Sequence, residues 1–453
     1  MHNILETING VVWGPPLIIL IVCVGIYISV STKFVQIRLL PKALKAFVGQ
    51  FKSKSVTNGT SSYRALCTAL AATVGTGNLA GVAGAIAIGG PGAIFWMWVC
   101  ALLGMATKFA EATLAVRFRE IYKNGYIGGP MYMICNGLGR KWKILAYMYC
   151  FFGVVASFGV GNAAQINTVL CSAEKIVVVY GGEFGPLARL LVGVVLAALV
   201  VVLFSGGAKR IGKMTELIVP FAAVFYILMG VAVLVLRFEV IPFALKSIII
   251  GAFSPEAITG GVVGSIFVTL RVGTSRGVFT NEAGMGTASI AHATGEVMDP
   301  CEQGLMGIVE VFLDTVVICT ITALVILCSG VAIPYGTDTG VSLTTDAFSY
   351  VLGDWICILL TVALCAFAIA TVLGWGFYGA RCAQFLFGDG AWSRVVILQG
   401  VVVILGACLH TDTVWLVSDI LNGLMAVPNL IALFLLTPEL QKLLGLKSVI
   451  NNM

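Results

Sequence analysis

The sequence predicts an all-α, polytopic membrane protein with about eleven spans, on the evidence of its composition and its long apolar runs. Of the 453 residues, 59% are hydrophobic and only 11% are charged, and the mean hydropathy is +1.01. Soluble domains carry about 25% charged residues, so no soluble fold could cover this much apolar surface. Many runs reach the roughly 20 apolar residues that a helix needs to cross the hydrocarbon core. No charge-rich or Ser/Pro-rich block interrupts them, so residues 1–453 are expected to form a single integral membrane domain.

The expected spans follow one another along the whole chain. They cover residues 11–32, 65–88, 93–116, 144–170, 190–205, 217–236, 258–279, 304–333, 355–378, 395–409 and 414–436. The first run lacks a preceding basic region and a small-residue cleavage site, so we expect a retained span and not a signal peptide. The 13 cysteines form no C-x-x-C pair and lie mostly in apolar runs, so no structural disulfide is expected.

The charges in the loops predict the orientation of the chain. Lys and Arg cluster after the first, third, fifth and ninth spans and after the last, whereas the segment before the first span has neither. The loop 334–354 also has neither and carries three Asp. The positive-inside rule therefore places the N-terminus outside and the C-terminus in the cytoplasm, as an odd number of spans requires. The net charge of only +6 is spread over these loops, which argues against nucleic-acid binding.

The second span contains a cluster of helix-weakening residues in its middle. Gly75, Gly77 and Gly81 fall within seven positions, and each Gly costs about 1 kcal/mol of helix stability relative to Ala. Thr and Asn side chains beside them compete for the backbone hydrogen bonds of the helix. We therefore expect the helix to unwind at Gly75–Asn78, facing protein or a water-filled site.

The seventh span carries a similar cluster, in which Gly273 and Gly277 flank Thr274 and Ser275. A second break is expected there. Each interrupted span opens a block of five spans, at residues 65–236 and 258–436, and the two blocks have opposite topology. The span at residues 11–32 precedes both blocks.

Paired broken helices in inverted repeats indicate a transporter binding site near the middle of the bilayer. The N-terminus of a half-helix offers free N–H groups to a carboxylate, while C-termini and unwound carbonyls suit Na⁺. A zwitterionic amino acid with a cation matches those fields. The alternative is that the glycines only allow helices to pack closely.

At these residues the sequence resembles the alanine or glycine:cation symporter family, over nearly the whole chain. The strongest stretches are residues 70–113 (LAATVGTGNLAGVAGAIAIGG onward), 276–288 (RGVFTNEAGMGTA) and 371–380 (TVLGWGFYGA). The resemblance implies a LeuT-like fold, with two inverted five-helix repeats and an extra N-terminal helix. It also implies sodium-coupled uptake of alanine or glycine across a prokaryotic plasma membrane.

The resemblance further implies roles for individual residues. The substrate contacts would be Thr76, Gly77, Asn78, Gln165, Gly273, Thr274 and Trp375. The first break would hold the carboxylate, while Gln165 and the carbonyls of the second break would take the ammonium. Trp375 would exclude large side chains. The sodium ligands would be the carbonyls of Ala71, Val74 and Ala368 and the hydroxyl of Thr371.

Each of these side chains also has a structural alternative. Gln165 could merely join helices, as polar residues in spans often do, and Asn78 could merely cap a half-helix. Thr371 could be a packing residue, and Trp375 could face lipid. The residues alone leave these alternatives open.

Ionisable residues within spans are candidates for function. Asp314 could belong to a proton or cation path, or it could pair with an Arg or Lys. Lys108 and Glu111 share a helix face and are expected to form a structural ion pair. Arg276 and Glu282 could form a cytoplasmic gate pair, or they could anchor the end of the seventh helix.

The function classes can then be compared. We expect a secondary transporter of small amino acids coupled to Na⁺; coupling to H⁺, or another small zwitterion, is the alternative on the same scaffold. A channel would favour a symmetric oligomeric pore with repeated filter motifs, and the paired broken helices argue against it. No H-E-x-x-H, G-x-S-x-G or Walker A sequence occurs, so an enzyme or an ATP-driven pump is disfavoured. The histidines His2, His292 and His410 lie outside the middle of the expected spans, which disfavours a histidine proton relay.

Overall fold

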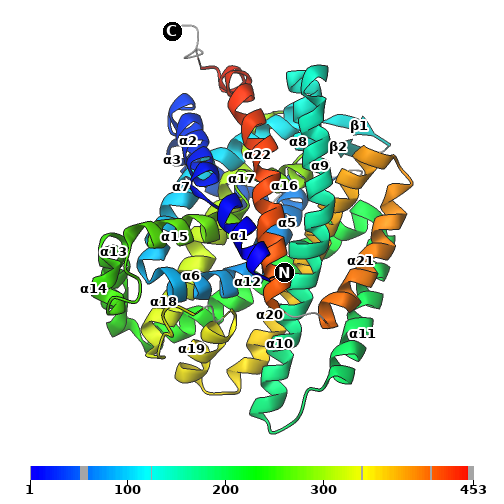
Figure 1. Cartoon of the computed structure of the whole chain (residues 1–453). Helices are drawn as coiled ribbons and strands as arrows, with labels where there is room; N and C mark the ends of the chain where they lie inside the picture. Colours follow the sequence, from blue (N-terminus) through cyan, green and yellow to red (C-terminus); the bar gives the residue numbers. More distant parts are fainter. Residues whose placement is uncertain (1, 51–59, 124, 338–339, 409–410, 447–453) are drawn as a thin grey trace.

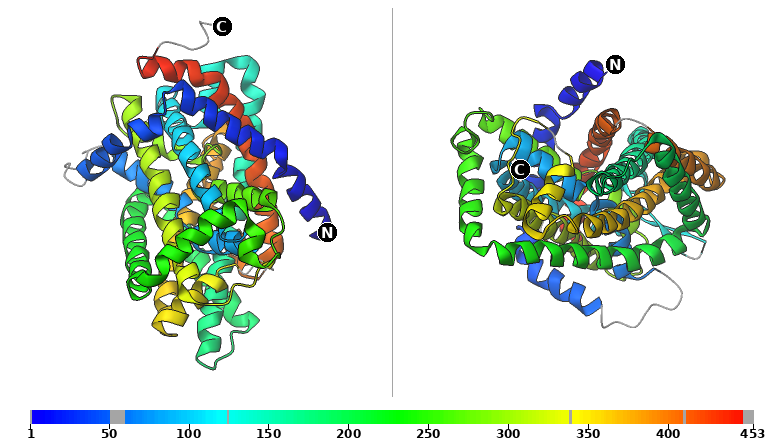
Figure 2. Two further views of the ribbon diagram at one scale, coloured as in Figure 1. Left: turned by 90° about the vertical axis from the view of Figure 1, so that its left-hand side faces the viewer. Right: turned by 90° about the horizontal axis from the view of Figure 1, so that it is seen from below.

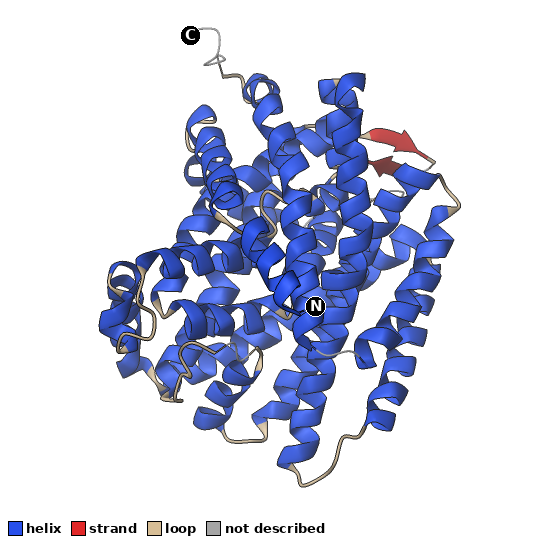
Figure 3. Cartoon of the chain, in the orientation of Figure 1, coloured by secondary structure: helices blue, strands red, loops and turns tan. Residues whose placement is uncertain are grey.

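The computed structural model describes residues 2–50, 60–123, 125–337, 340–408 and 411–446. They form a bundle of α-helices, most of whose long members run along the vertical axis of Figure 1, and Figure 2 shows the same bundle from the side and from below. One short antiparallel hairpin, β1 (Glu120–Tyr122) with β2 (Gly125–Ile127), lies at the end of the bundle near the C-terminus (Figure 3). The all-α class is therefore confirmed. Leu409 at the end of the tenth expected span, and His410, lie outside the described residues.

The long helices follow the expected spans closely. The first span is α2 (Pro15–Ser31), which follows α1 (His2–Val12). Spans two to six are α5 (Ser62–Thr73) with α6 (Val82–Gly89), α7 (Gly92–Arg117), α9 (Lys143–Phe158) with α10 (Ala164–Val179), α11 (Pro186–Ser205) and α12 (Gly207–Leu236). The later spans are α15 (Ile266–Asn281), α17 (Pro300–Val311) with α18 (Thr320–Ser329), α20 (Ile356–Phe387), α21 (Ala391–Cys408) and α22 (Thr411–Leu443).

Shorter elements connect these helices. They are α3 (Val35–Arg38), α4 (Leu40–Gln50), α8 (Pro130–Tyr132), α13 (Ile241–Phe253), α14 (Pro255–Thr259), α16 (Thr287–His292) and α19 (Ser342–Leu352). Stretches of π-helix occupy Gly77–Gly81, Met133–Leu138, Gly159–Ala163 and Phe312–Cys319, and 3₁₀ turns occupy Arg140–Trp142 and Phe238–Val240. Three of the π-helical stretches lie within spans, where such irregularities often mark functional sites.

The exact count of eleven spans is not confirmed. Within the described ranges, nine continuous helical runs are long and apolar enough to cross a membrane, and the bent pair α5–α6 makes ten. The seventh expected span is the exception, because α15 has only 16 residues and is followed by a break and the short α16. A helix of that length falls short of the roughly 20 residues that a full crossing needs.

The outer helices present apolar side chains to their surroundings, as expected for helices in contact with lipid. On α11 and α12 the exposed residues include Leu191, Val195, Leu199, Leu217, Phe221 and Val224. Contiguous apolar surface of this kind would be a liability in water. In a bilayer the same apolar surface faces the lipid tails, where it is favourable.

The first predicted break is confirmed. The helix α5 ends at Thr73, Val74 has an extended ψ of 97°, and the chain then re-enters a helix through Gly77–Gly81. The two halves of this span are bent by 51° relative to each other. All the residues from Thr73 to Leu79 are buried, so the break faces protein rather than lipid.

The second predicted break is wrong in position. The helix α15 continues without a break through residues 273–277. Gly273 and Gly277 instead allow this helix to pack closely against α7. A Cβ at position 273 would lie 2.4 Å from the carbonyl oxygen of Ala93, and one at 277 would lie 3.1 Å from Cys100 Cβ. These two glycines therefore allow close helix packing, which was the alternative to a break in the helix.

The actual second break follows α15 and separates it from α16. Glu282 closes α15 with a φ of 54°, and Gly284 and Gly286 have φ values of 92° and 78°. Such values favour glycine, because a Cβ there clashes with the backbone. The break thus lies at residues 282–286, in the stretch RGVFTNEAGMGTA, and not at the glycines of the expected span.

Candidate functional site

The first break is stabilised mainly by its own residues. The N–H of Gly75 donates to Asn78 Oδ1 at 2.8 Å, and the N–H of Asn78 returns to the carbonyl of Gly75 at 3.2 Å. The N–H of Ala80 donates to Thr76 O at 2.8 Å and starts the next helical stretch. Asn78 therefore makes the capping contact that was the alternative to a role in substrate binding.

The N–H group of Thr76 in this break donates no hydrogen bond to a described residue, and Thr76 is buried. Gly77, which follows it at the start of the π-helical turn, is buried as well. Buried N–H groups in proteins are almost always paired. A buried donor of this kind, with no acidic side chain bonded to it, is suited to an anionic group.

Gln165 joins α10 to the break. Its Oε1 accepts from the hydroxyl of Thr76 at 2.7 Å, and its Nε2 donates to Val160 O at 3.1 Å. Gln165 follows the π-helical turn Gly159–Ala163, which leaves the carbonyl of Val160 available to it. The side chain is 3% exposed, so Oε1 keeps a second lone pair in a buried position beside the break.

Thr371 of α20 directs an unsatisfied oxygen at the same break. Its Oγ1 is buried without a hydrogen-bond partner among the described residues, and a Cβ at Gly75 would lie 2.5 Å from it. Ala71 and Val74 lie at the C-terminal end of α5, where carbonyls lack helical partners and carry partial negative charge. Ala368 precedes Thr371 by one turn of α20, and all four residues are buried.

Trp375 lies one turn beyond Thr371 and lines the interior. It is 1% exposed, and a Cβ at Gly161 would lie 2.1 Å from its Cβ, so α20 packs directly on the π-helical turn of α9–α10. The alternative that Trp375 faces lipid is therefore wrong.

The two broken helices meet, although not at the residues we predicted. A Cβ at Gly77 would lie 3.3 Å from Phe279, and one at Gly81 would lie 3.8 Å from Thr280, in the last turn of α15. By contrast, the closest neighbours of position 273 lie in α7, and Thr274 O accepts from Cys100 Sγ at 3.8 Å. Since α15 is helical there, the carbonyls of residues 273 and 274 are also engaged within the helix.

Asp314 is a part of the site whose partner the sequence did not identify. It lies in the π-helical stretch between α17 and α18, and its Oδ1 accepts from Asn78 Nδ2 at 2.6 Å. Its Oδ2 accepts from Thr315 Oγ1 at 2.8 Å, and no described Arg or Lys forms an ion pair with it. The alternative that Asp314 pairs with a base is wrong, and the polar contact to Asn78 takes its place.

The second break is held by a carboxylate from a neighbouring helix. Glu111 Oε1 accepts from the N–H groups of Gly284 at 2.9 Å and Gly286 at 3.1 Å. It also accepts from Asn429 Nδ2 of α22 at 2.8 Å. The expected Lys108–Glu111 pair is therefore absent from the described contacts, because Glu111 is directed at the second break.

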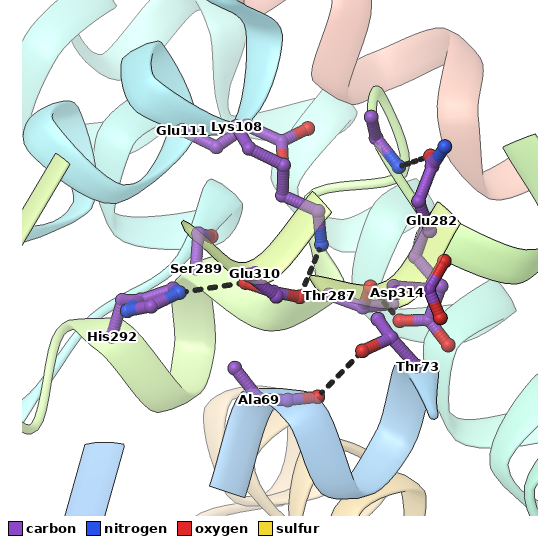
Figure 4. A network of polar contacts seen from close by, with 12 residues as sticks. Ala69, Thr73, Lys108, Glu111, Glu282, Thr287, Ser289, His292, Glu310 and Asp314 are labelled. Atoms are coloured by element: carbon purple, nitrogen blue, oxygen red, sulfur yellow. Dashed lines mark hydrogen bonds and ion pairs between the residues drawn. The ribbon is translucent and has the colours of Figure 1, made fainter. Parts of the chain in front are cut away.

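Lys108 instead forms a buried ion pair with Glu310 of α17, at 3.0 Å from Nζ to Oε1 (Figure 4). The suggested Arg276–Glu282 gate pair is not formed either. Glu282 accepts from Thr287 Oγ1 at 2.5 Å, and Arg276 lines a cavity elsewhere in the bundle.

Comparison with known proteins assigns the chain to a family. The family model described as the sodium:alanine symporter family matches residues 1–446. The chain belongs to the sodium:alanine symporter family. The sodium/alanine symporter AgcS of Methanococcus maripaludis is 42% identical over 442 residues, which are 96% of this chain and 94% of AgcS. This symporter is thus a transport protein and not an enzyme.

Other relatives agree on transport and differ in their named solutes. A Bacillus subtilis protein described as the probable sodium/glutamine symporter GlnT is 37% identical, with 96% of this chain and 89% of that protein covered. Among solved structures, MhsT in complex with L-phenylalanine matches with a TM-score of 0.62 at 16% identity, covering 84% of the symporter and 90% of MhsT. That likeness confirms the LeuT-like fold expected from the sequence.

A cavity of about 820 Å³ leads toward the first break of the symporter. It lies between α1, α10, α15, α19 and α22 and reaches Ala80 and Gly81 of the π-helical turn. Thr168, which also lines it, is one helical turn from Gln165. The charged residues of its lining are Glu6, Lys175, Arg271, Arg276 and Asp419. The cavity gives polar solutes a route to Ala80 and Gly81, next to the break.

Proposed function

We propose that this symporter imports small amino acids, alanine and glycine, together with Na⁺ by alternating access. The observation that carries the proposal is the first break. It combines the N–H group of Thr76 with the hydroxyl of Thr371, and neither has a partner among the described residues. A free N–H group suits an anionic group, and a free hydroxyl oxygen suits a cation. An amino acid bound together with sodium supplies both.

The substrate carboxylate binds the N–H groups of Thr76 and Gly77, in the field of the half-helix that begins there. Asn78 stabilises this turn by accepting from the N–H of Gly75, and its Nδ2 donates to Asp314 Oδ1. The substrate ammonium donates a hydrogen bond to the second lone pair of Gln165 Oε1. The carbonyl end of α15 adds partial negative charge on the other side, in the role first expected of Gly273 and Thr274.

Sodium binds between Thr371 and the end of α5, with the carbonyls of Ala71, Val74 and Ala368 as its other ligands. Oxygen ligands of this kind suit a hard cation. Because the ion would fix the backbone that carries the carboxylate site, each ligand raises the affinity for the other by the same factor.

The preference for small side chains follows from the packing around the break. Trp375 packs against Gly161 and Phe279 against Gly77, so two large aromatic rings lie close to the break, which supports the exclusion of large side chains. The relative named for glutamine indicates that members of the family differ in their solute.

We further propose that the protein lies in a prokaryotic plasma membrane with its N-terminus outside. The Lys- and Arg-rich segments around α3 and around the β1–β2 hairpin lie at the end of the bundle that carries the C-terminus (Figure 1). The acidic segment at α19 lies toward the opposite end. The positive-inside rule assigns the first of these ends to the cytoplasm.

The test is uptake of radiolabelled alanine into proteoliposomes, with the Na⁺ gradient and the pH gradient imposed separately. Uptake that follows the Na⁺ gradient and is insensitive to the pH gradient is expected. Uptake driven by the pH gradient alone would favour proton coupling, for which the buried carboxylate of Asp314, bonded to Asn78 and without a described basic partner, is the specific candidate. Absence of alanine and glycine uptake under both gradients would contradict the proposal.

A further inference from the structure

The inner halves of the two broken spans meet at a single side chain. Ser62, the first residue of α5, donates from Oγ to Gln303 Oε1 of α17 at 2.7 Å. Gln303 Nε2 lies 2.7 Å from Nδ1 of His292, the last residue of α16. Gln303 and His292 are fully buried, and Ser62 is nearly so. One amide of α17 therefore joins the half-helix that precedes the first break to the half-helix that follows the second.

The hydrogen bonds of this set have a fixed direction. Since Gln303 Oε1 accepts from Ser62, its Nε2 must donate to His292 Nδ1. The proton of the neutral imidazole then lies on Nε2, which donates to Glu310 Oε2 at 2.8 Å. The other oxygen of Glu310 accepts from Lys108, so the set ends in a charged pair (Figure 4). Every member is satisfied, which makes the set stabilising as a unit.

Backbone contacts close the same region. The N–H of Glu296 donates to Thr60 O at 2.9 Å, which ties the segment after α16 to the segment before α5. The guanidinium of Arg119, just beyond α7, donates at 2.5–3.2 Å to three carbonyls of the segment after α16. These carbonyls belong to Ala293, Gly295 and Val297.

We propose that Ser62, Gln303, His292, Glu310 and Lys108 form an inner latch, which closes the path from the first break to the end of the bundle near the C-terminus. The helices α5 and α16 are each separated from the rest of their span by a break, so they can tilt without moving α6 or α15. The latch joins these two helices to each other through α17. Release of the solute at this end requires the bonds at Gln303 to open.

The direction of release rests on the proposed function, but the latch itself can be tested without a substrate. Hydrogen–deuterium exchange of residues 62–73 and 287–297 is measured by mass spectrometry on the purified full chain. In Gln303→Ala both segments should exchange roughly tenfold faster than in wild type, because two buried hydrogen bonds are lost. Na⁺ should restore part of the protection, since the ion holds the end of α5.

Gln441→Ala is the matched control. Gln441 is also a buried glutamine near this end of the bundle, but its Nε2 donates to Ser31 O of α2, at 3.0 Å, and no described hydrogen bond joins it to either half-helix. The exchange of residues 62–73 and 287–297 should be unchanged in this variant. Ser62→Ala removes only the bond to α5, so it should loosen residues 62–73 and leave residues 287–297 protected. This variant decides the matter if Gln303→Ala fails to fold.

A gate and a structural contact differ in their effect on transport. If the latch is a gate, Gln303→Ala should raise the outside KM for alanine several-fold and speed efflux from preloaded proteoliposomes. Gln303→Glu keeps an acceptor for Ser62 and should show a smaller effect. Wild-type exchange in a folded Gln303→Ala protein would overturn the latch, and so would a fall in uptake and efflux by the same factor. Failure of wild-type alanine uptake in the same preparation would instead count against the proposed function.

Discussion

The two breaks of this symporter treat their free N–H groups in different ways. In the second break, the N–H groups of Gly284 and Gly286 bind the carboxylate of Glu111. In the first break, the N–H group of Thr76 has no acceptor in the described residues. Both breaks create a place for a carboxylate, as unwound helices do.

The difference indicates which break is structural and which is available to a solute. The protein occupies the N–H groups of Gly284 and Gly286 in the second break with its own side chain, so they are not available to a solute. The first break is capped only by the neutral amide of Asn78. A solute carboxylate can enter it without displacing a charged group. Substitutions at four positions test this difference between the two breaks.

The largest effect is expected from Asn78→Ala. The substitution removes the cap on Gly75 and leaves the Asp314 carboxylate without its 2.6 Å partner. Leaving a buried group unsatisfied costs about 1–3 kcal/mol, so alanine affinity should fall by about five- to 150-fold. Equilibrium binding of radiolabelled alanine measures this, with Gln441→Ala as the control. Wild-type affinity in the Asn78 variant would remove the first break from the account.

The second break is tested by Glu111→Ala. Two backbone N–H groups and the Asn429 amide lose their acceptor, so the free energy of unfolding should fall by about 3 kcal/mol. A thermal melt of the purified protein measures the loss. Glu111→Gln keeps an acceptor oxygen and should lose less than half as much. Equal stability of wild type and Glu111→Ala would show that the second break does not depend on this carboxylate.

The ion site is tested by Thr371→Val, which replaces the unpaired hydroxyl by a methyl group of similar size. The Na⁺ concentration for half-maximal alanine binding should rise about tenfold, as for the loss of one ligand worth about 1.4 kcal/mol. Thr371→Ser retains the hydroxyl and should stay close to wild type. An unchanged Na⁺ dependence in the Val variant would place the ion elsewhere.

The smallest effect is expected from Thr274→Val. This residue lies within the continuous helix α15, and its carbonyl accepts from Cys100 of α7. The KM for alanine should change less than about twofold. A tenfold increase would restore Thr274 to the substrate site, and residues 273–277 would then do more than pack α15 against α7.

The overall fold and the first break could be predicted from the sequence, because both depend on local signals. Apolar runs fix the spans, and Gly75, Gly77 and Gly81 weaken one helix in its middle. The resemblance then indicated Gln165 and Thr371, and the structure brings both to that break.

The second break could not be located in this way, since glycines serve two purposes that look alike in a sequence. Gly273 and Gly277 bring α15 against α7, whereas Gly284 and Gly286 supply positive φ. The two roles of glycine can be distinguished only when the position of α7 is known. The partner of the break, Glu111, lies 173 residues from Gly284 in the chain.

The partners of the ionisable residues could not be predicted from the sequence either. Lys108 and Glu111 share a helix, which suggested a local pair. In the structure each reaches a different neighbouring helix, and Lys108 becomes the charged end of the inner latch. Such long-range contacts depend on packing that no local pattern records.

The central claim is that the first break binds the carboxylate of the transported amino acid. Calorimetric titration of the wild-type protein with alanine and with alaninamide, each in sodium chloride and in choline chloride, tests it most directly. Alanine should bind in sodium alone, and alaninamide, which lacks the carboxylate, should bind at least about a hundredfold more weakly. Equal affinity for the two compounds would contradict the account.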